Sequence, residues 1–352
     1  MNEKVRLASV GLGRWARVLA RGAHRGDVIE LYSCYSRSED RRKAFQSEYG
    51  IPRAAATLDA LLADSAIEGV IVTTPNDTHR EVITQALEAG KAVYTDKPIA
   101  QTLEDAIAIR EAVRRTGGLL AVGHSARRLS GSRVMKRWIE DGTLGEVSMA
   151  EANFSNERGL ELTPNTWRWY VDKTPGGPLI QLGVHHADNL QYLLGPVGAV
   201  TAVQRKLYTP SEVPDATMAI LEFESGALGY LGCGWASPGI YQIRVQGTRQ
   251  NLMYDLDFTH WDDAHEADAW SSLVSQAYGQ PERTPVELPP TDMFREQLEE
   301  FALASRGEAT VEVQADDAIR ALAVVHTAIE SNRLGGRTVE VKTFLDAVGV
   351  VS

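Results

Sequence analysis

The sequence predicts an α/β protein with two domains: a doubly wound parallel sheet, then an α+β domain with a largely antiparallel sheet that is open on one face. At about 150 residues per domain, a chain of 352 residues is long enough for two. Residues 1–125 alternate short apolar runs with helical patterns, which is typical of β-α-β units. Residues 126–352 contain runs of alternating polar and apolar residues joined by short turns, which is typical of antiparallel strands.

The first domain has the elements of a parallel sheet with right-handed crossovers. Its predicted strands are rich in Val, Ile, Leu and Ala, as expected for strands buried on both faces. They cover residues 5–10, 28–35, 69–73, 92–95 and 119–123. Helical patterns lie between them at 15–24, 40–49, 58–63, 79–89 and 103–115.

The second domain has a different pattern. Helices are predicted at 132–141, 179–194, 291–306 and 315–334. Strands are predicted at 146–155, 199–207, 217–224, 227–235 and 241–246, with a further candidate at 251–255. Their polar–apolar alternation indicates a sheet with one covered face and one open face.

Composition argues against several classes of function. The chain has 36 Lys and Arg against 47 Asp and Glu, a net charge of −11, which disfavours nucleic acid and anionic membranes as partners. No apolar run reaches the roughly 20 residues of a membrane helix, and the N-terminus leads directly into a strand pattern. We therefore expect no signal peptide and a cytoplasmic protein. The two cysteines, Cys34 and Cys233, lie far apart and fit buried thiols better than a metal or disulfide site.

A glycine motif follows the first predicted strand. Gly11-Leu12-Gly13-Arg14-Trp15-Ala16 has the pattern G-x-G-x-x-A and opens a helix. The first Gly permits a tight turn, the second lets the backbone approach a pyrophosphate, and the helix N-terminus faces the phosphates. Because the motif lies between a strand and a helix, it predicts a dinucleotide site.

The end of the second strand indicates which dinucleotide is bound. An acid that binds the adenosine ribose is usual there, but this chain has Ser36 and Arg37, followed by Arg41 and Arg42. A hydroxyl and a guanidinium suit a 2′-phosphate, so the sequence favours NADP over NAD. Glu30 lies too far back along the strand to replace the acid.

Further motifs follow in a fixed order along the whole chain. They are Thr73-Thr74-Pro75-Asn76-Asp77-Thr78-His79, Gly90-Lys91-Ala92-Val93, Asp96-Lys97-Pro98, Gly123-His124-Ser125-Ala126-Arg127 and the run from Gly176-Gly177-Pro178 to His185-His186-Ala187-Asp188. Together they resemble the Gfo/Idh/MocA oxidoreductases, the glucose–fructose oxidoreductase and inositol dehydrogenase family.

The resemblance implies a site and a reaction. It makes residues 1–125 the dinucleotide-binding Rossmann domain and residues 126–352 the substrate-binding and oligomerisation domain. It implies Lys97 as the catalytic lysine, usually followed by a cis proline, and His185 as the histidine. The expected cofactor contacts are Gly11, Gly13, Arg14, Trp15, Ser36, Arg37, Thr74, Pro75, Asn76, His79, Asp96 and Lys97.

The chain departs from the family pattern at two positions. Asp96 replaces a glutamate and keeps its charge. Gln181 replaces an aspartate, and an amide can orient a hydroxyl or an imidazole but cannot accept a proton. We therefore expect His185 to take the proton of a secondary alcohol, Lys97 to hydrogen-bond the developing alkoxide, and Gln181 to orient the site. His186, on the other side of the helix, is expected to be structural.

The substrate pocket is expected between the cofactor and the open face of the second domain. Candidate contacts are Arg127 or its neighbour Arg128, Trp167, Arg168, Gln181 and His185, with Asn153 and Trp235 weaker. If residues 166–170 are extended, the two tryptophans of the run point one way and Arg168 the other. A sugar or polyol is the family's usual substrate, and the arginines leave an acidic sugar or a carboxylated cyclic diol open.

Three further expectations concern metals, partners and alternative functions. The run His260-Trp261-Asp262-Asp263-Ala264-His265-Glu266 could suggest a metal, but it fits a solvated acidic loop better, so we expect no metal site. Trp235, Leu231 and Ile220 would expose much apolar area on the open face, which favours a homodimer or homotetramer. A dinucleotide-assisted glycosidase and a non-catalytic dinucleotide sensor are the alternative functions.

Overall fold

The computed structural model describes residues 3–257 and 265–347. The chain forms two compact units. The first comprises Met1–His124 and Asp292–Ile319, and the second comprises Ser125–Thr291 and Arg320–Ser352. The sequence pattern assigns every residue after 125 to the second domain, whereas Asp292–Ile319 clusters with the first unit.

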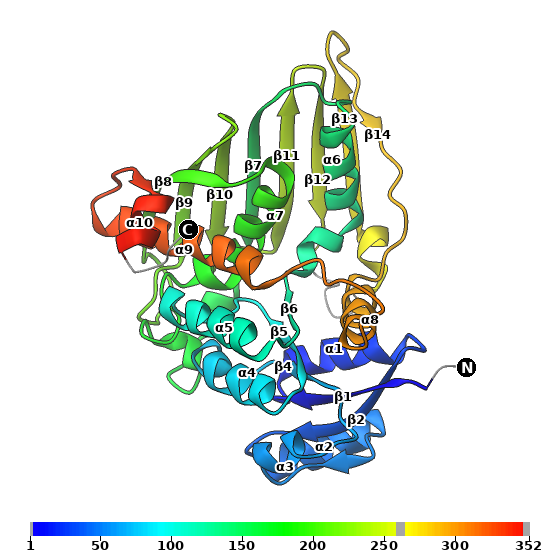
Figure 1. Cartoon of the computed structure of the whole chain (residues 1–352). Coiled ribbons are helices and arrows are strands. Elements are labelled where there is room, and N and C mark those ends of the chain that lie inside the picture. The colour runs from blue at the N-terminus through cyan, green and yellow to red at the C-terminus, as the bar shows by residue number, and fades with distance from the viewer. Residues whose placement is uncertain (1–2, 258–264, 348–352) are drawn as a thin grey trace. The chain divides into compact units, whose positions relative to one another are not determined.

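The first unit is built on a six-stranded parallel sheet with the order β3-β2-β1-β4-β5-β6, coloured blue to cyan in Figure 1. Val, Ile, Leu and Ala fill the central strands, which are almost fully buried, as their composition predicts. The elements are β1 (Val5–Val10), α1 (Arg14–His24), β2 (Ile29–Tyr35), α2 (Glu39–Tyr49), β3 (Arg53–Ala54), α3 (Leu58–Leu62), β4 (Gly69–Val72), α4 (His79–Glu88), β5 (Ala92–Asp96), α5 (Leu103–Thr116), β6 (Leu120–Gly123) and α8 (Met293–Ser305).

Side-chain contacts explain why α8 belongs to the first unit. Phe294 of α8 packs against Gly22 of α1, where an added Cβ would lie 3.1 Å from the Phe294 Cβ. At the start of α8, Asp292 caps the helix by accepting a bond from the backbone N–H of Arg295. The same carboxylate accepts two bonds from the Arg25 guanidinium, at 2.6 and 2.8 Å.

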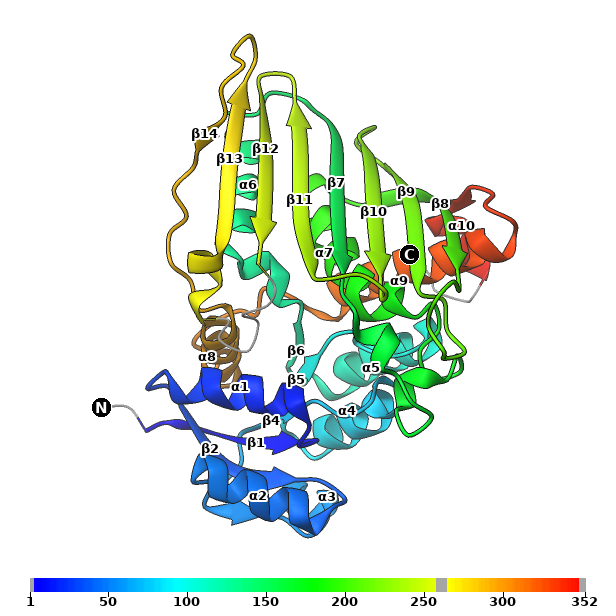
Figure 2. The same ribbon diagram turned by 180° about the vertical axis from the view of Figure 1, so that it is seen from behind.

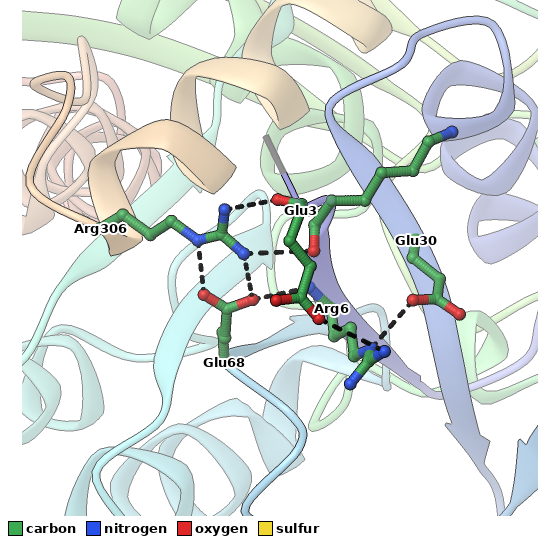
Figure 3. A network of polar contacts seen from close by, with 6 residues as sticks. Glu3, Arg6, Glu30, Glu68 and Arg306 are labelled. Atoms are coloured by element: carbon green, nitrogen blue, oxygen red, sulfur yellow. Dashed lines mark hydrogen bonds and ion pairs between the residues drawn. The ribbon is translucent and has the colours of Figure 1, made fainter. Parts of the chain in front are cut away.

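A second set of contacts fastens the end of α8 to the sheet (Figure 3). Arg306 donates to both carboxylate oxygens of Glu68, each at 2.7 Å, and to the backbone oxygens of Glu3 and Lys4. Glu68 also accepts from the backbone N–H of Arg6 in β1. Segments far apart in the sequence are therefore held together at the amino ends of β1 and β4.

The second unit is built on a nine-stranded mixed sheet with the order β14-β13-β12-β11-β7-β10-β9-β8-β15. Within this second sheet, as far as the structure describes it, only the β7–β10 pairing is parallel. The elements are α6 (Ser130–Glu140), β7 (Val147–Ser155), α7 (Val184–Leu194), β8 (Val197–Arg205), β9 (Ala216–Phe223), β10 (Leu228–Gly234), β11 (Ile240–Gly247), β12 (Gln250–Leu256), β13 (Ser271–Ala277), β14 (Thr284–Pro285), β15 (Val339–Glu340) and α10 (Val341–Ala347). Helix α9 (Ala315–Arg333) is divided between the units after Ile319.

One face of this sheet carries helices and the other is open, as expected (Figure 2). Burial alternates along β9, and Ile220 of β9 and Leu228 of β10 are exposed on the open face. The expectation that Trp235 and Leu231 lie on that face is wrong, because both are buried. In the register of the two strands, Ile220 pairs with Tyr230, so the neighbouring Leu231 points to the covered face.

None of the helices that the structure describes is long and apolar enough to cross a membrane.

Candidate active site

The predicted cofactor residues gather at one edge of the first unit's sheet. The strands β1, β4 and β5 are neighbours and run parallel, so their carboxyl ends meet at the same edge. Gly11 follows β1, residues 73–79 follow β4, and Asp96-Lys97 end and follow β5. The first two loops are joined directly, because the Thr73 hydroxyl donates to the Gly11 carbonyl oxygen at 2.7 Å.

The glycines leave the space that a pyrophosphate needs. Gly11 has φ +88°, and an added Cβ would lie 2.9 Å from the Thr73 and Thr74 backbone, so only glycine fits there. A Cβ on Gly13 would meet no atom within 4 Å, because this residue faces open space at the N-cap of α1. Arg14 and Trp15 begin α1, with Trp15 set edge-on against Phe294. These features fit a dinucleotide phosphate at the helix N-terminus.

The loop after β2 places Arg37 at the surface. Arg37 is exposed, and Ser36 before it is half-buried. The Ser36 hydroxyl donates to the Ser38 carbonyl oxygen, and the Arg42 guanidinium donates to the Ser36 carbonyl oxygen at 2.6 Å. Arg42 therefore holds the loop in place through its backbone, while the Arg37 side chain is exposed to solvent.

The loop after β4 carries an amide that suits a ligand. Asn76 is 7% exposed, and its Nδ2 has no hydrogen-bond partner among the residues that the structure describes. A buried amide N–H2 without a partner costs free energy, so a bound group that accepts its hydrogen bonds would be stabilising. Thr74 and Pro75 precede it, and the Thr78 hydroxyl bonds Thr74 Oγ1 and the Pro75 carbonyl oxygen. The Asn76 amide is therefore a hydrogen-bond donor that fits a nicotinamide dinucleotide.

His79 is buried beneath these loops. The residue is 1% exposed, and both ring nitrogens face backbone carbonyl oxygens, those of Thr74, Pro98 and Ile99. Burial is the main reason that the pKa of this imidazole lies below its usual value.

Lys97 follows the last residue of β5 and lies beside a cis peptide bond. Asp96 ends β5 and pairs with Gly123 of β6, and both Asp96 and Lys97 are half-buried. The peptide between Lys97 and Pro98 is cis, as the resemblance implies. Lys97 therefore shares the sheet edge with Gly11 and Asn76.

In the second unit, three predicted substrate residues lie together. Trp167–Trp169 is a 3₁₀ helix and not an extended run, so the expectation that the two tryptophans point one way and Arg168 the other does not apply. The Arg168 guanidinium stacks on the Trp167 ring at 4.2 Å, and its Nε donates to Gln181 Oε1 at 3.1 Å. Gln181 lies in a π-helical turn, Leu179–Gly183, just before α7, and such turns are frequent at functional sites.

His185 and His186 occupy the first turn of α7. His185 is 5% exposed, with its ring 5.5 Å from that of Phe154. Phe154 points to the covered face of the sheet, so His185 lies on that side and not at the open face, where we expected the pocket. His186 is fully buried against Phe154 and Tyr241, as expected for a structural residue, and burial lowers its pKa to about 4.

The two arginines after β6 are buried, and one has a carboxylate partner in α7. Arg127 Nε and Nη2 donate to the two carboxylate oxygens of Asp188 at 2.8 and 2.6 Å. Asp188 has no exposed side-chain area. Because this guanidinium holds α7 in place, we retain Arg168 and not Arg127 as the candidate for binding a substrate anion. Of the weaker candidates, Trp235 is buried, and Asn153 lies on the open face and accepts from the Ser155 hydroxyl.

Within residues 3–257 and 265–347, no three His, Cys, Asp or Glu side chains are grouped so as to hold a metal ion. The run from His260 to Glu266 lies mostly outside the described residues, which resume at His265.

Comparison with known proteins shows the family. Residues 5–124 match the oxidoreductase family with an NAD-binding Rossmann fold, and residues 132–253 match the GFO/IDH/MocA C-terminal domain. The chain belongs to the Gfo/Idh/MocA family. It is therefore an oxidoreductase that uses a nicotinamide dinucleotide, and the resemblance seen in the sequence is confirmed.

Three relatives illustrate the likeness to other Gfo/Idh/MocA proteins. The 1,5-anhydro-D-fructose reductase of Ensifer adhaerens is 26% identical over 341 residues, covering 96% of this chain and 98% of its own. An NAD⁺-dependent scyllo-inositol 2-dehydrogenase of Bacillus subtilis is 29% identical, covering 70% and 72%. The crystal structure of a candidate NADPH-dependent oxidoreductase from Desulfitobacterium hafniense is 42% identical with a TM-score of 0.94, covering 97% and 99%.

Two Gfo/Idh/MocA site features were not predicted from the sequence. Thr73 joins two cofactor loops, and Asp188 binds Arg127. Asp188 is recognisable as polar and close to His185 on the helix, but its partner lies 61 positions away, and such a pairing is visible only in the fold.

Proposed function

We propose that this protein is an NADP-preferring oxidoreductase that acts on a secondary alcohol of a sugar, a polyol or a related cyclic diol. The observation that carries the proposal is the sheet edge where the Gly11 turn, the buried Asn76 amide and Lys97 lie on three neighbouring strand ends. The names of the relatives support a reductase or dehydrogenase of sugar-like alcohols.

The preference for NADP rests on the loop after β2. Arg37 is exposed where an acid would bind the ribose of NAD, and Arg42 holds the loop through the Ser36 carbonyl oxygen. A guanidinium in this position attracts a 2′-phosphate, whereas a carboxylate would repel it. The relatives include both an NAD⁺ enzyme and a candidate NADPH enzyme.

Lys97 and His185 are proposed as the two catalytic residues. Hydride exchange with the substrate carbon is the chemistry that a nicotinamide would supply when bound. His185 would take the hydroxyl proton, and the Lys97 ammonium would hydrogen-bond the developing alkoxide. Gln181 would orient the substrate and Arg168, because its amide oxygen already accepts from the Arg168 guanidinium.

Residues of the second unit would set the substrate class. The Trp167 ring suits the C–H face of a sugar, and the neighbouring Arg168 guanidinium suits a carboxylate or phosphate. An acidic sugar or a carboxylated cyclic diol therefore belongs in the substrate panel beside neutral sugars and inositols.

The open sheet face is proposed as the interface of a homodimer or homotetramer. Met149, Val203, Met218, Ile220 and Leu228 are between 36% and 65% exposed. They are contiguous, because Leu228 pairs with Met149 and Met218 with Val203 across the ladder of β7, β10, β9 and β8. A second copy would remove this apolar area from water.

A substrate panel tests the proposed function. Purified protein is incubated with sugars, inositols, uronic acids and dihydrodiols, with NAD⁺ and NADP⁺ in one direction and the oxidised compounds with NADH and NADPH in the other. Stoichiometric absorbance change of the dinucleotide is expected. Release of sugar from a glycoside without net dinucleotide change would indicate the glycosidase instead, and binding without turnover of any compound would indicate the sensor.

A further inference from the structure

The carboxyl edge of the first unit's sheet has two links between neighbouring loops. The first is the Thr73 hydroxyl, which joins the β4 loop to Gly11 after β1. The second is His79, whose Nε2 lies 2.9 Å from the Thr74 carbonyl oxygen. Its Nδ1 lies 3.1 Å from the Pro98 oxygen and 3.2 Å from the Ile99 oxygen.

We propose that His79 is a positioning residue that sets Asn76 and Lys97 relative to one another by joining the loops that carry them. Thr74 lies two residues before Asn76, and Pro98 directly follows Lys97. One imidazole ring therefore contacts the backbone close to Asn76, the proposed dinucleotide ligand, and the backbone next to Lys97, the proposed catalytic lysine. The inference rests on the proposed function, which gives Asn76 and Lys97 their roles.

The geometry replaces the cofactor contact first expected of His79. The residue is 1% exposed, and both polar atoms of its side chain face backbone carbonyl oxygens of the protein itself. A carbonyl oxygen can only accept, so each link is a hydrogen bond only when the ring nitrogen that faces it carries a proton. The doubly protonated ring makes both links, and a neutral ring makes the one that its tautomer allows. The two links are consequently separable, because one depends on Nε2 and the other on Nδ1.

Two substitutions can separate them. The amide nitrogen of Gln lies close to the Nε2 position, so His79→Gln keeps a donor for Thr74 and loses the link to Pro98 and Ile99. The amide of Asn lies close to the Nδ1 position, so His79→Asn keeps the second link and loses the first. His79→Ala loses both. If His79 only stabilised the fold, the His79→Gln and His79→Asn variants would not differ in which of the two functions they lose.

The test measures dinucleotide binding by fluorescence titration with NADPH, amide hydrogen exchange of the two loops, and turnover. For His79→Asn we expect NADPH binding weaker by about tenfold, with kcat at saturating dinucleotide within about threefold of wild type. For His79→Gln we expect nearly unchanged NADPH binding, faster exchange of residues 99–101, and kcat lower by about tenfold. His79→Ala should show both defects. Equal effects of Asn and Gln on binding and exchange, or wild-type behaviour of His79→Ala, would overturn the inference.

A measurement on the unmodified protein covers the case in which the variants fail to fold. In ¹⁵N-edited spectra, a ring N–H of His79 should exchange with water far more slowly than that of His24, which lies at the exposed end of α1. Equally fast exchange of both would contradict the inference. Absence of turnover in the wild type would contradict the proposed function, while the binding and exchange results would still decide the role of His79.

Discussion

The Arg127 guanidinium and the Asp188 carboxylate form a buried ion pair through two hydrogen bonds of 2.8 and 2.6 Å. The pair joins the segment after β6 to α7, the helix that carries His185. Removing one partner of a buried pair leaves the other charge without compensation. The pair therefore links the stability of the second unit to the position of the candidate base.

Arg127→Leu should lower the free energy of unfolding by about 3–5 kcal/mol, because Asp188 remains buried and charged. Urea denaturation followed by circular dichroism measures this change. Arg333→Leu is the matched control, since Arg333 makes the same two-bond contact with Glu330 but at the surface, where a pair contributes about 1 kcal/mol or less. A similar loss of unfolding free energy in both variants would show that the buried Arg127–Asp188 pair stabilises the protein no more than a surface pair does.

Arg306→Ala should destabilise the first unit by about 1–2 kcal/mol near pH 7, because Glu68 and the β1 backbone lose their common partner. The Arg306 hydrogen bond is the main reason that the pKa of Glu68 lies below its usual value. A lowered folded pKa means that this stabilisation is present above the unfolded pKa of about 4.3 and is lost as pH falls through the folded pKa.

The difference in unfolding free energy between wild type and Arg306→Ala should therefore shrink below about pH 4. Denaturation series at several pH values check this. Lys43→Ala removes an exposed pair with Glu39 and is the control with little effect at any pH. A difference that stays constant down to pH 2 would exclude the Glu68 charge as its source.

Arg37→Ala should raise the KM for NADP⁺ by about tenfold or more and leave the KM for NAD⁺ nearly unchanged, because only NADP⁺ carries the phosphate that the guanidinium would bind. Initial rates with both dinucleotides measure the ratio. Arg41→Ala, another exposed arginine of this region, is the matched control. If both KM values change together, the selectivity lies elsewhere.

Met218→Lys with Ile220→Glu should turn the proposed homodimer or homotetramer into a monomer, because both side chains lie on the open apolar face. Sedimentation or light scattering gives the mass. The matched control is Val171→Lys, a change of an exposed apolar residue outside that face. An unchanged mass of the double variant would place the interface on another surface.

Much of the fold follows from patterns along the sequence. Five of the six strands that the structure describes in the first unit were predicted to within one residue at each end, because strands that are largely buried are apolar runs. The sixth, β3, is two exposed residues long and was not predicted. The membership of α8 was not predicted, since it depends on Arg25 and Glu68, which lie more than 200 positions away.

The faces of the second sheet depend on register, which local sequence does not fix. Period-two alternation shows that Leu231 and Tyr230 face opposite ways, but only the pairing of Tyr230 with Ile220 shows which of them is exposed. The run around Arg168 has strand-like residues, yet it folds as a 3₁₀ turn with its guanidinium held by Gln181, a tertiary contact.

Lys97 and His185 are proposed to act on one alcohol in a dinucleotide-dependent oxidation or reduction. The most direct measurement is kcat at saturating substrate and NADP(H) for wild type, Lys97→Ala and His185→Ala, with His24→Ala as the surface control and thermal unfolding as the check on folding. We expect kcat to fall by about 100-fold or more for Lys97→Ala and His185→Ala and to stay unchanged for the control. A folded His185→Ala or Lys97→Ala protein with near wild-type kcat would contradict it.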